Sequence, residues 1–233
     1  MCGRYTLTIS PAELKNAFPT VDFHIEHTPR FNIAPTQMIP VIRQVENSSL
    51  RADLFKWGLI PSWSKDETIG YRLINARAET LAEKPAFRGA YKSRRCLIPA
   101  DGFFEWVIIE GSKTKLPIYF FQKSREAFAF AGLWETWKSP NGEVINSATI
   151  ITTEPNALVG RFHDRMPVIL PNEAYTTWLT PGSKSPIELH SLLKPYPEVE
   201  MDCHPVSPLA NSPKNDSSEI IIPLKCLDAI QYS

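Results

Sequence analysis

The chain is poor in glycine, with 10 glycines against 21 prolines in 233 residues, and it lacks several common signatures. No apolar run approaches the length of a membrane-spanning helix. The first residues form no apolar secretory signal, and the four cysteines include no CxxC pair. There is no glycine-rich phosphate loop. These absences predict a cytoplasmic protein with reduced thiols, no membrane association and no cofactor.

Net charge is also absent, since Lys+Arg and Asp+Glu number 25 each. A neutral chain does not coat nucleic acid through bulk charge. Locally, residues 70–96 hold seven basic and two acidic residues, whereas residues 181–233 hold four lysines and seven acids. The middle of the chain can therefore face an anion, although a solvated surface explains the same pattern.

Short β-branched and aromatic runs, separated by turn residues, predict strands in the first two thirds of the chain. Asn141-Gly142 is typical of a hairpin turn. The predicted strands are Met38–Arg43, Asp53–Trp57, Phe103–Ile109, Leu116–Phe121, Phe128–Trp134 and Ala148–Thr152.

Two helix starts are predicted at Ser10 and Ser185, each of which is followed by Pro and, three residues later, by Glu. This pattern is typical of a capping box with Pro at the first helical position. Residues 76–82 and 172–179 are further predicted helices. Residues 205–219 are polar and rich in Pro and Ser, and form either a flexible tail or an irregular segment packed on the core. The pattern predicts a β-rich α+β fold, with curved antiparallel sheets, a barrel-like core and peripheral helices.

Cys2 becomes the first residue if Met1 is removed, which places an α-amine and a thiol two carbons apart. Such a pair condenses with an aldehyde: the amine forms a Schiff base and the thiol closes a five-membered thiazolidine ring. The α-amine has a pKa of about 7.7–8.0, so part of it is neutral near pH 7. The cation of Arg4 is expected to lower the pKa of the thiol. An ordinary terminal cysteine and an N-terminal-nucleophile amidohydrolase remain alternatives.

Eight segments lie in order from residue 1 to about residue 223: Met1–Tyr5, Arg30–Pro35, Trp57–Pro61, Ile74–Thr80, Arg95–Trp106, Ala131–Trp134, His163–Val168 and His204–Ser207. Together they resemble the SOS-response-associated peptidase (SRAP) family of abasic-site processing proteins. The resemblance implies one domain over residues 1–223, followed by a tail at 224–233. It also implies that Met1 is lost, with autoproteolysis as one route, and that Cys2 traps abasic sites as a thiazolidine.

The resemblance further implies a DNA-repair function that shields the lesion. Its partners would be single-stranded DNA with abasic sites and single-strand/double-strand junctions. Activity would be that of a thiol autopeptidase and DNA–protein crosslinker, with lyase or hydrolase side activity. We expect a monomer that joins the nucleoid when bound to DNA. A DNA-binding module without covalent chemistry is a further alternative.

Four catalytic residues are carried over from the family: Cys2 as nucleophile, with Asn75, Glu105 and His163 lining the site. The aromatic neighbours of Glu105 are expected to raise its pKa, so that it can exchange protons during Schiff-base formation. His163 can exchange a proton with the sugar oxygen. Asn75 offers a neutral donor and acceptor, or caps the helix predicted at 76–82.

Phosphate contacts are expected from Arg4 and Arg77, because a guanidinium binds phosphate in a bidentate manner. Trp63 and Phe87 are candidate stacking platforms for bases, whereas Trp57 is expected in the core. Asn32 and Lys92 complete the predicted DNA-binding set, with Arg94 and Arg95 as an extension of the phosphate track or as a solvated face. No metal site is predicted, because the closely spaced His24 and His27 have no second pair of ligands.

Overall fold

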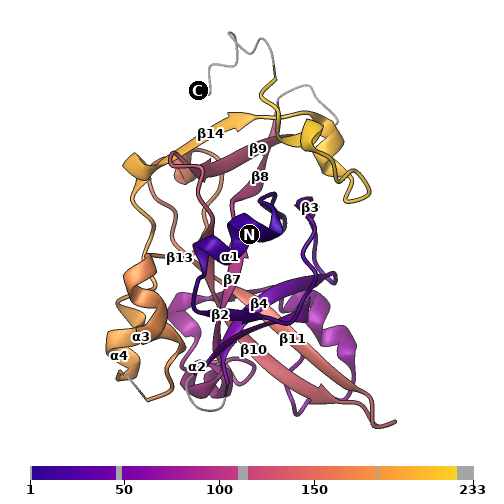
Figure 1. Cartoon of the computed structure of the whole chain (residues 1–233), viewed down its shortest axis with the longest axis vertical. Coiled ribbons are helices and arrows are strands. Elements are labelled where there is room, and N and C mark those ends of the chain that lie inside the picture. Colours follow the sequence, from indigo (N-terminus) through magenta and orange to yellow (C-terminus); the bar gives the residue numbers. More distant parts are fainter. Residues whose placement is uncertain (1, 46–48, 110–114, 183, 225–233) are drawn as a thin grey trace.

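The computed structural model describes residues 2–45, 49–109, 115–182 and 184–224. Two curved sheets contribute to one main hydrophobic core, and short helices lie on the outside (Figure 1). The predicted β-rich α+β fold with a barrel-like core is therefore confirmed. The predicted tail lies outside the described residues beyond Leu224.

The smaller sheet is antiparallel, in the order β14-β9-β8-β1-β3. Side chains alternate across a strand, so Phe103 faces the main core while Phe104 faces a second, smaller apolar cluster. The strand bounds are β1 Tyr5–Leu7, β3 Arg30–Ile33, β8 Gly102–Ile108, β9 Lys115–Gln122 and β14 Met201–Pro205.

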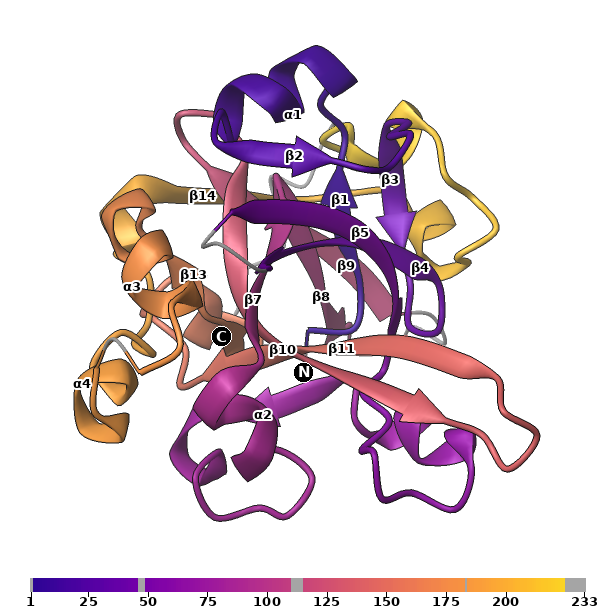
Figure 2. The ribbon, with the colours of Figure 1, turned by 60° about the horizontal axis from the view of Figure 1, so that its bottom comes forward.

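Five strands of the larger sheet close into a barrel, seen end-on in Figure 2. Closure comes from β5, which pairs with β4 on one side and with β11 on the other. The closing pair is parallel, with Ser147 opposite Lys56 and Ala148 opposite Trp57. In ring order the strands are β11 Val144–Thr153, β10 Phe128–Lys138, β7 Arg95–Ala100, β4 Met38–Gln44 and β5 Leu50–Trp57.

Short strands extend the barrel, and two of them prepare the functional site. Next to the end of β11, Thr152 pairs with Arg77 on one side and with Pro167 on the other. This arrangement brings the segments around Asn75 and His163 to the same end of β11. The short strands are β2 Val21–Phe23, β6 Asn75–Arg77, β12 Met166–Pro167 and β13 Ile169–Leu170.

Aromatic rings join the first strand to the barrel. Tyr5 packs edge-on against Trp57 and Phe130, with ring centroids 5.3 and 5.8 Å apart. All three side chains are fully buried. Edge-to-face pairs of this kind stabilise the folded state by about 0.5–1.5 kcal/mol, in addition to the contribution from burying the rings. The residues that follow Cys2 are therefore held firmly inside the fold.

Both predicted capping boxes are confirmed, at Ser10 and Ser185. In each, the serine oxygen accepts a hydrogen bond from the backbone amide of the glutamate, whose carboxylate in turn accepts from the serine amide. Residues 172–179 are helical as predicted, as a 3₁₀ turn followed by α3. The helices are α1 Pro11–Ala17, α2 Arg88–Ser93, α3 Tyr175–Leu179 and α4 Pro186–His190, and the 3₁₀ turns are η2 Glu67–Arg72, η3 Ala78–Thr80, η4 Val159–Arg161, η5 Asn172–Ala174, η6 Glu198–Glu200, η7 Pro208–Asn211 and η8 Ser218–Ile221.

The helix predicted over residues 76–82 is wrong. Asn75 to Arg77 form β6, which pairs with Ile150 to Thr152 of β11, and only the 3₁₀ turn η3 follows. Pairing with a distant strand outweighs the local helical preference of this alanine-rich stretch. Asn75 is consequently a strand residue and not a helix cap.

All six predicted strands are confirmed, with ends shifted by a few residues. The hairpin predicted at Asn141-Gly142 joins β10 to β11, where Lys138 pairs with Val144. Gly142 has a φ of 87°, in the left-handed region that glycine tolerates.

Two structures were predicted for residues 205–219, and the structure confirms the second, an irregular segment packed on the rest of the fold. Asn32 Nδ2 donates to the carbonyl oxygens of Ala210, Ser212 and Asn215, at 3.3, 3.0 and 2.7 Å. The Asp216 carboxylate accepts from the backbone amide of Asn32 at 2.9 Å. The segment is thereby fastened to β3.

Across the described residues, no helix combines the length and apolar character needed to span a bilayer.

Candidate active site

Cys2 is completely buried just before β1. Asn75 Nδ2 donates to the Cys2 carbonyl oxygen at 2.8 Å, and two residues later the Phe104 amide donates to the Arg4 carbonyl oxygen at 3.0 Å. These bonds tie the start of the chain to β6 on one side and to β8 on the other. The backbone around Cys2 is therefore held by a side-chain hydrogen bond from β6 and by a backbone hydrogen bond from β8.

The thiol of Cys2 has a pKa raised well above its ordinary value. Burial is the largest cause, and the negative charge of Glu105 adds to it. The expectation that the Arg4 cation lowers this pKa is wrong: Arg4 acts only through its backbone amide, whose hydrogen bond opposes the shift without overcoming burial. The resting sulfur is consequently a neutral thiol.

Glu105 lies on β8, and its side chain is only 3% exposed. Its pKa is raised to about 8, chiefly by burial and further by the charge of Asp164. The upward shift of this pKa was predicted, but the cause that was predicted for it, the two aromatic neighbours in sequence, is wrong. Phe104 and Trp106 flank Glu105 in sequence and lie on the opposite face of the strand, in the second apolar cluster.

His163 lies in the turn after η4 and faces Glu105, with 3.9 Å between His163 Nε2 and Glu105 Oε2. Its other nitrogen, Nδ1, accepts a hydrogen bond from the Arg165 amide at 2.9 Å. Burial, followed by the positive charge of the amino terminus, lowers the pKa of His163. Near neutral pH the ring is therefore mainly uncharged.

The four predicted catalytic residues thus come together from four separate segments. Asn75 bonds to Cys2, the charge of Glu105 acts on Cys2, and Glu105 faces His163. Asn75 Oδ1 is buried and has no hydrogen-bond partner among the described residues. The group combines a thiol, a carboxyl group protonated near neutral pH, an imidazole and an amide, which suits addition to a carbonyl compound followed by loss of water.

Arg4 and Asn32, predicted to contact DNA, serve the protein itself. Arg4 Nη1 donates to Asn32 Oδ1 at 2.6 Å and to the Ala210 carbonyl at 3.0 Å, and its guanidinium lies 5.5 Å from the centre of the Trp106 ring. Asn32 is completely buried and spends both its amide nitrogen and its oxygen on protein partners. As placed, Asn32 offers no side-chain atom to DNA.

Two further residues named with the DNA-binding surface lie inside the protein. Arg95 is 2% exposed and donates to the backbone carbonyls of Trp178, Tyr91, Lys92 and Thr180, so it is neither a phosphate contact nor part of a solvated face. Phe87 is 7% exposed and packs in the main core, so its ring is not available for stacking.

The remaining DNA-binding candidates are accessible. Arg77 and Lys92 are exposed, on β6 and α2. Trp63 is 60% exposed, between surface pockets of about 490 and 590 Å³. Trp57 is buried, as expected, and its indole donates to the Ile74 carbonyl at 2.9 Å.

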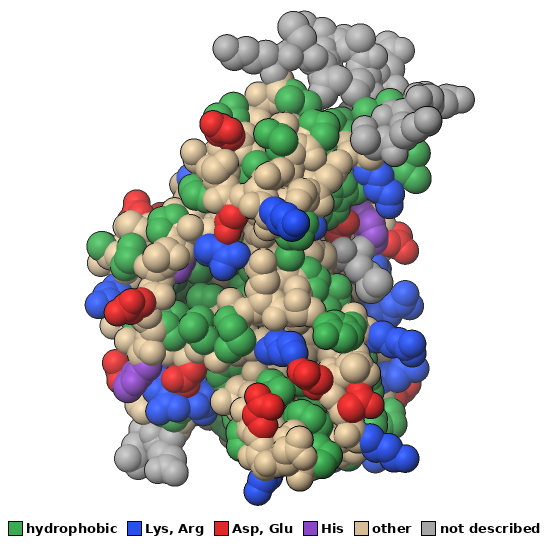
Figure 3. Space-filling model, turned by 90° about the vertical axis from the view of Figure 1, so that its right-hand side faces the viewer, with side chains coloured by type: hydrophobic (Ala, Val, Ile, Leu, Met, Phe, Trp, Pro, Cys, Tyr) green, Lys and Arg blue, Asp and Glu red, His purple; other side chains and the backbone are tan. Residues whose placement is uncertain are grey.

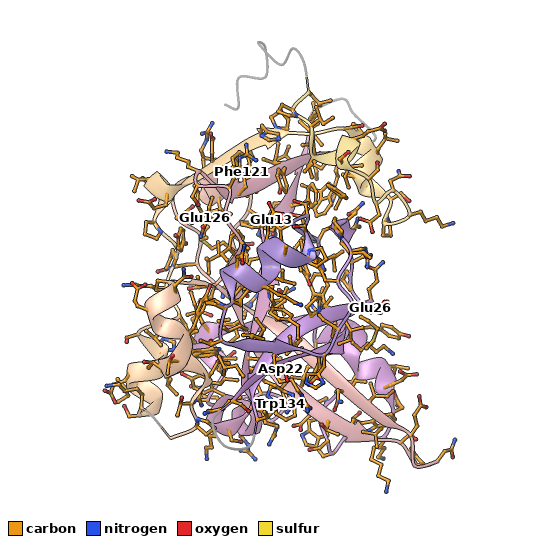
Figure 4. The ribbon with its side chains drawn as sticks, in the orientation of Figure 1. Glu13, Asp22, Glu26, Phe121, Glu126 and Trp134 are labelled. Atoms are coloured by element: carbon orange, nitrogen blue, oxygen red, sulfur yellow. The ribbon has the colours of Figure 1, made fainter. Side chains whose placement is uncertain are left out.

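Charge is distributed unevenly over the surface. Lys and Arg side chains follow one edge of the face in Figure 3. On the face carrying α1 and β2, the exposed acids Glu13 and Glu126 (Figure 4) lie in one surface pocket with the exposed Arg125, so acidic and basic side chains are mixed there.

Sequence reasoning missed Glu79, Asp164 and Arg165, although all three lie in segments that carried the resemblance. Arg165 binds Glu79 through two hydrogen bonds of 2.7 and 3.0 Å, which lower the pKa of Glu79. Arg165 Nη2 also donates to the Thr152 carbonyl at 2.7 Å. The turn bearing His163 is thereby clamped to β11 and to the segment after β6. Their closeness to Asn75 and His163 in sequence was the available signal.

In the part of the chain that the structure describes, no three His, Cys, Asp or Glu residues form a group that could hold a metal ion. His24 Nε2 lies 2.6 Å from an Asp22 carboxylate oxygen, and His27 Nε2 lies 2.8 Å from the Ile9 carbonyl oxygen. These two histidines therefore have separate partners.

Comparison with known proteins adds an independent result. A family model described as SOS response associated peptidase (SRAP) matches residues 1–213. Abasic site processing protein YoqW of Bacillus subtilis is 48% identical over 223 residues, covering 95% of this chain and 99% of that protein. Abasic site processing protein HMCES of Rattus norvegicus is 30% identical over 238 residues, covering 87% and 67%.

A solved structure has the same fold. The crystal structure of a protein from Bacteroides thetaiotaomicron matches with a TM-score of 0.86 and 28% sequence identity. The match covers 96% of this chain and all of that one.

Proposed function

Because this chain belongs to the SOS response associated peptidase (SRAP) family, we propose that it processes abasic sites in DNA by covalent attachment through Cys2. The relatives are named for abasic-site processing, and the site described above has the groups this chemistry needs. Removal of Met1, by self-cleavage or by another enzyme, would expose the aminothiol. The attached protein would then shield the lesion during repair.

The observation that carries this proposal is the burial of Cys2 beside Glu105 and Asn75. A terminal cysteine without a role is expected to be exposed, since chain ends are seldom tied down. Here the fold encloses it with a carboxyl group whose pKa is about 8. Raised carboxyl pKa values of this kind are typical of catalytic acids.

The α-amine of Cys2 would attack the aldehyde of the ring-opened sugar first, because the thiol is held neutral by burial. The resulting carbinolamine must lose water to become a Schiff base, and protonated Glu105 would supply the proton to the departing oxygen. The thiol then adds to the Schiff-base carbon and closes the thiazolidine ring.

Asn75 and His163 would assist these steps. Asn75 holds the Cys2 carbonyl, and its buried Oδ1, which has no hydrogen-bond partner among the described residues, would accept from the amine or from a sugar hydroxyl. His163 would move the proton needed to open the sugar ring, since a neutral imidazole can both accept and donate one.

Single-stranded DNA and single-strand/double-strand junctions are the proposed substrates. Arg77 and Lys92 would contact phosphates, and Trp63 would stack on an exposed base. Arg4 and Asn32 would support the site from within. We further propose that residues 1–223 act as one monomeric domain in the cytoplasm, at the nucleoid when bound to DNA.

The direct test mixes the protein with single-stranded DNA carrying one abasic site, followed by a denaturing gel. A shifted band that survives denaturation is expected, and it should disappear for Cys2→Ala and for a chain with extra residues fixed before Cys2. Binding without a surviving band would leave a non-covalent DNA-binding protein. Release of ammonia from glutamine, without DNA binding, would instead indicate an amidohydrolase.

A further inference from the structure

We propose that His163 and Asp164 form a relay that carries protons between the buried Glu105 and solvent. This relay rests on the proposed function and adds Asp164 to the residues of the site. It follows from the order in which three side chains stand between the interior and the surface.

The exposed fraction of the side chain increases at each step along the proposed path. The side chain of Glu105 is 3% exposed, that of His163 is 26% exposed and that of Asp164 is 84% exposed. Glu105 Oε2 lies 3.9 Å from His163 Nε2, and His163 Nδ1 lies 3.0 Å from Asp164 Oδ1. The imidazole therefore presents one nitrogen to the buried acid and the other to a carboxylate in water.

Such a path is needed because the proposed reaction releases a proton inside a closed site. At pH 7 most of the α-amine is an ammonium group. Ammonium, thiol and aldehyde together carry four hydrogens on nitrogen and sulfur. When the C–N and C–S bonds form and the carbonyl oxygen departs, one hydrogen stays on the ring nitrogen and two leave in water. The fourth must leave as a proton.

Glu105 can take that proton but cannot pass it directly to solvent, because its side chain is buried. His163 Nε2 is the neighbouring acceptor. The gap of 3.9 Å exceeds a direct hydrogen bond, so transfer occurs through one water molecule or after a small movement of the ring.

Nδ1 of His163 has partners for both protonation states. When Nδ1 carries hydrogen, it can donate to Asp164 and leave the Nε2 lone pair facing Glu105. After Nε2 has accepted a proton and Nδ1 has passed one to Asp164, the Arg165 amide donates to the bare Nδ1 at 2.9 Å. The turn therefore stabilises the imidazole before and after one transfer.

The surroundings of His163 favour release of a proton from its ring over retention of that proton. Glu105 faces it from β8, and Asp164 and Arg165 belong to its own turn. Burial has the largest effect and lowers the pKa of His163, while the charge of Asp164 raises it. A proton on the ring is therefore released readily, and the nearest acceptor on the solvent side is Asp164.

The test compares Asp164→Asn with Asp164→Glu, and with Glu154→Gln as the matched control. Glu154 is an exposed acid that follows β11, and the adjacent Thr153 pairs with Met166 of the same His163 segment. Single-turnover crosslinking to abasic single-stranded DNA is followed at low buffer concentration, then with added imidazole. Affinity for DNA without the lesion is measured in parallel.

Asp164→Asn should crosslink at least about 10-fold more slowly at low buffer, a modest part of the ~10²–10⁴-fold typical of acid–base catalysis. Added imidazole should restore most of the rate, because a free proton carrier can replace the relay. Asp164→Glu should keep most of the parent rate. The parent protein and Glu154→Gln should not respond to imidazole, and DNA affinity should match between the two charge-removing variants.

Two results would overturn the relay while leaving the proposed function intact: a parent-like rate for Asp164→Asn at low buffer, or a slow rate that imidazole does not restore. The second would mean that Asp164 only shapes the turn. If the parent protein forms no crosslink at all, the proposed function fails first and the relay falls with it.

Discussion

Asp101 and Glu105 are buried carboxyl groups four residues apart, and the protein uses them in opposite ways. The Asp101 carboxylate accepts hydrogen bonds from the Thr6 and Thr8 hydroxyls and from the backbone amides of Thr8 and Ile9. Glu105 instead lies beside Cys2 and His163 with its pKa raised to about 8. The first carboxyl group fastens the end of β1, and we propose that the second exchanges protons at the start of the chain.

The same division separates residues of other types. Arg95 is enclosed by four carbonyl oxygens, whereas Arg77 is exposed on β6. Phe87 is packed in the core, whereas Trp63 projects from the surface. Residue type alone does not show whether a side chain has a structural or a functional role here. The surroundings decide which side chains are bound within the protein and which stay accessible to a partner.

The largest effect is expected from Glu105→Gln, which keeps the shape of the side chain and removes its proton exchange. The single-turnover crosslinking rate should fall by ~10²–10⁴-fold. Affinity for DNA without the lesion should stay unchanged, because Glu105 is buried. Time courses on denaturing gels, beside an affinity titration, measure both quantities. A parent-like rate would mean that the contrast with Asp101 has no catalytic meaning.

Asp101→Asn should affect stability and not chemistry. The substitution removes the charge that four donors share and turns an amide group toward them, which should lower the free energy of unfolding by about 3 kcal/mol. Guanidinium unfolding curves provide the measurement. At a temperature where the variant is folded, crosslinking should proceed at nearly the parent rate. A stable variant with slow crosslinking would reverse the roles assigned to the two carboxyl groups.

The stability of Glu105→Gln relative to the parent protein should increase as the pH rises. The raised pKa means that the unfolded chain releases the Glu105 proton above about pH 4.3, while the folded protein keeps it to about pH 8. The parent therefore loses stability across that window. Glu105→Gln, which escapes the loss, should be more stable by on the order of 3 kcal/mol at pH 7 and nearly equal at pH 4.

Trp63→Ala and Phe87→Ala should separate binding from stability. Trp63→Ala removes the ring on which one base is proposed to stack, so it should weaken binding to single-stranded DNA by ~1–3 kcal/mol and leave the free energy of unfolding unchanged. Phe87→Ala empties part of the core and should destabilise by about 3–5 kcal/mol. Fluorescence anisotropy with labelled DNA and thermal unfolding distinguish the two. Equal destabilisation by both would show that Trp63 is also structural.

The smallest expected effect is that of Arg77→Ala on the salt dependence of DNA binding. Loss of one phosphate contact should weaken binding to all sequences alike and reduce the slope of log affinity against log salt by about one unit. Affinity titrations at several salt concentrations measure the slope. An unchanged slope with altered base preference would show that Arg77 reads bases.

Local sequence patterns were sufficient for the strands and both capping boxes, because alternation and capping depend on neighbours in the chain. They failed at residues 76–82, where pairing with β11 outweighs helix preference. Cys2, Asn75, Glu105 and His163 were named from ordered motifs, and the structure brings them together. The fates of Asn32, Arg95 and Phe87 were not predictable, since burial against distant segments leaves no periodic signal. Asp164 and Arg165 were visible only as neighbours of His163.

Barrel closure has a consequence for the synthesis of the protein. The closing pair joins Lys56 to Ser147, which lie about ninety residues apart, and pairings of such long range are slow to form. On the ribosome, β5 emerges long before β11, and His163 emerges later still. At ~5–20 residues per second, roughly 8–30 seconds separate the appearance of Cys2 from that of His163, the last of the four proposed site residues. Cys2 therefore lacks the contacts that bury it during that interval, and its enclosure is an event of late folding.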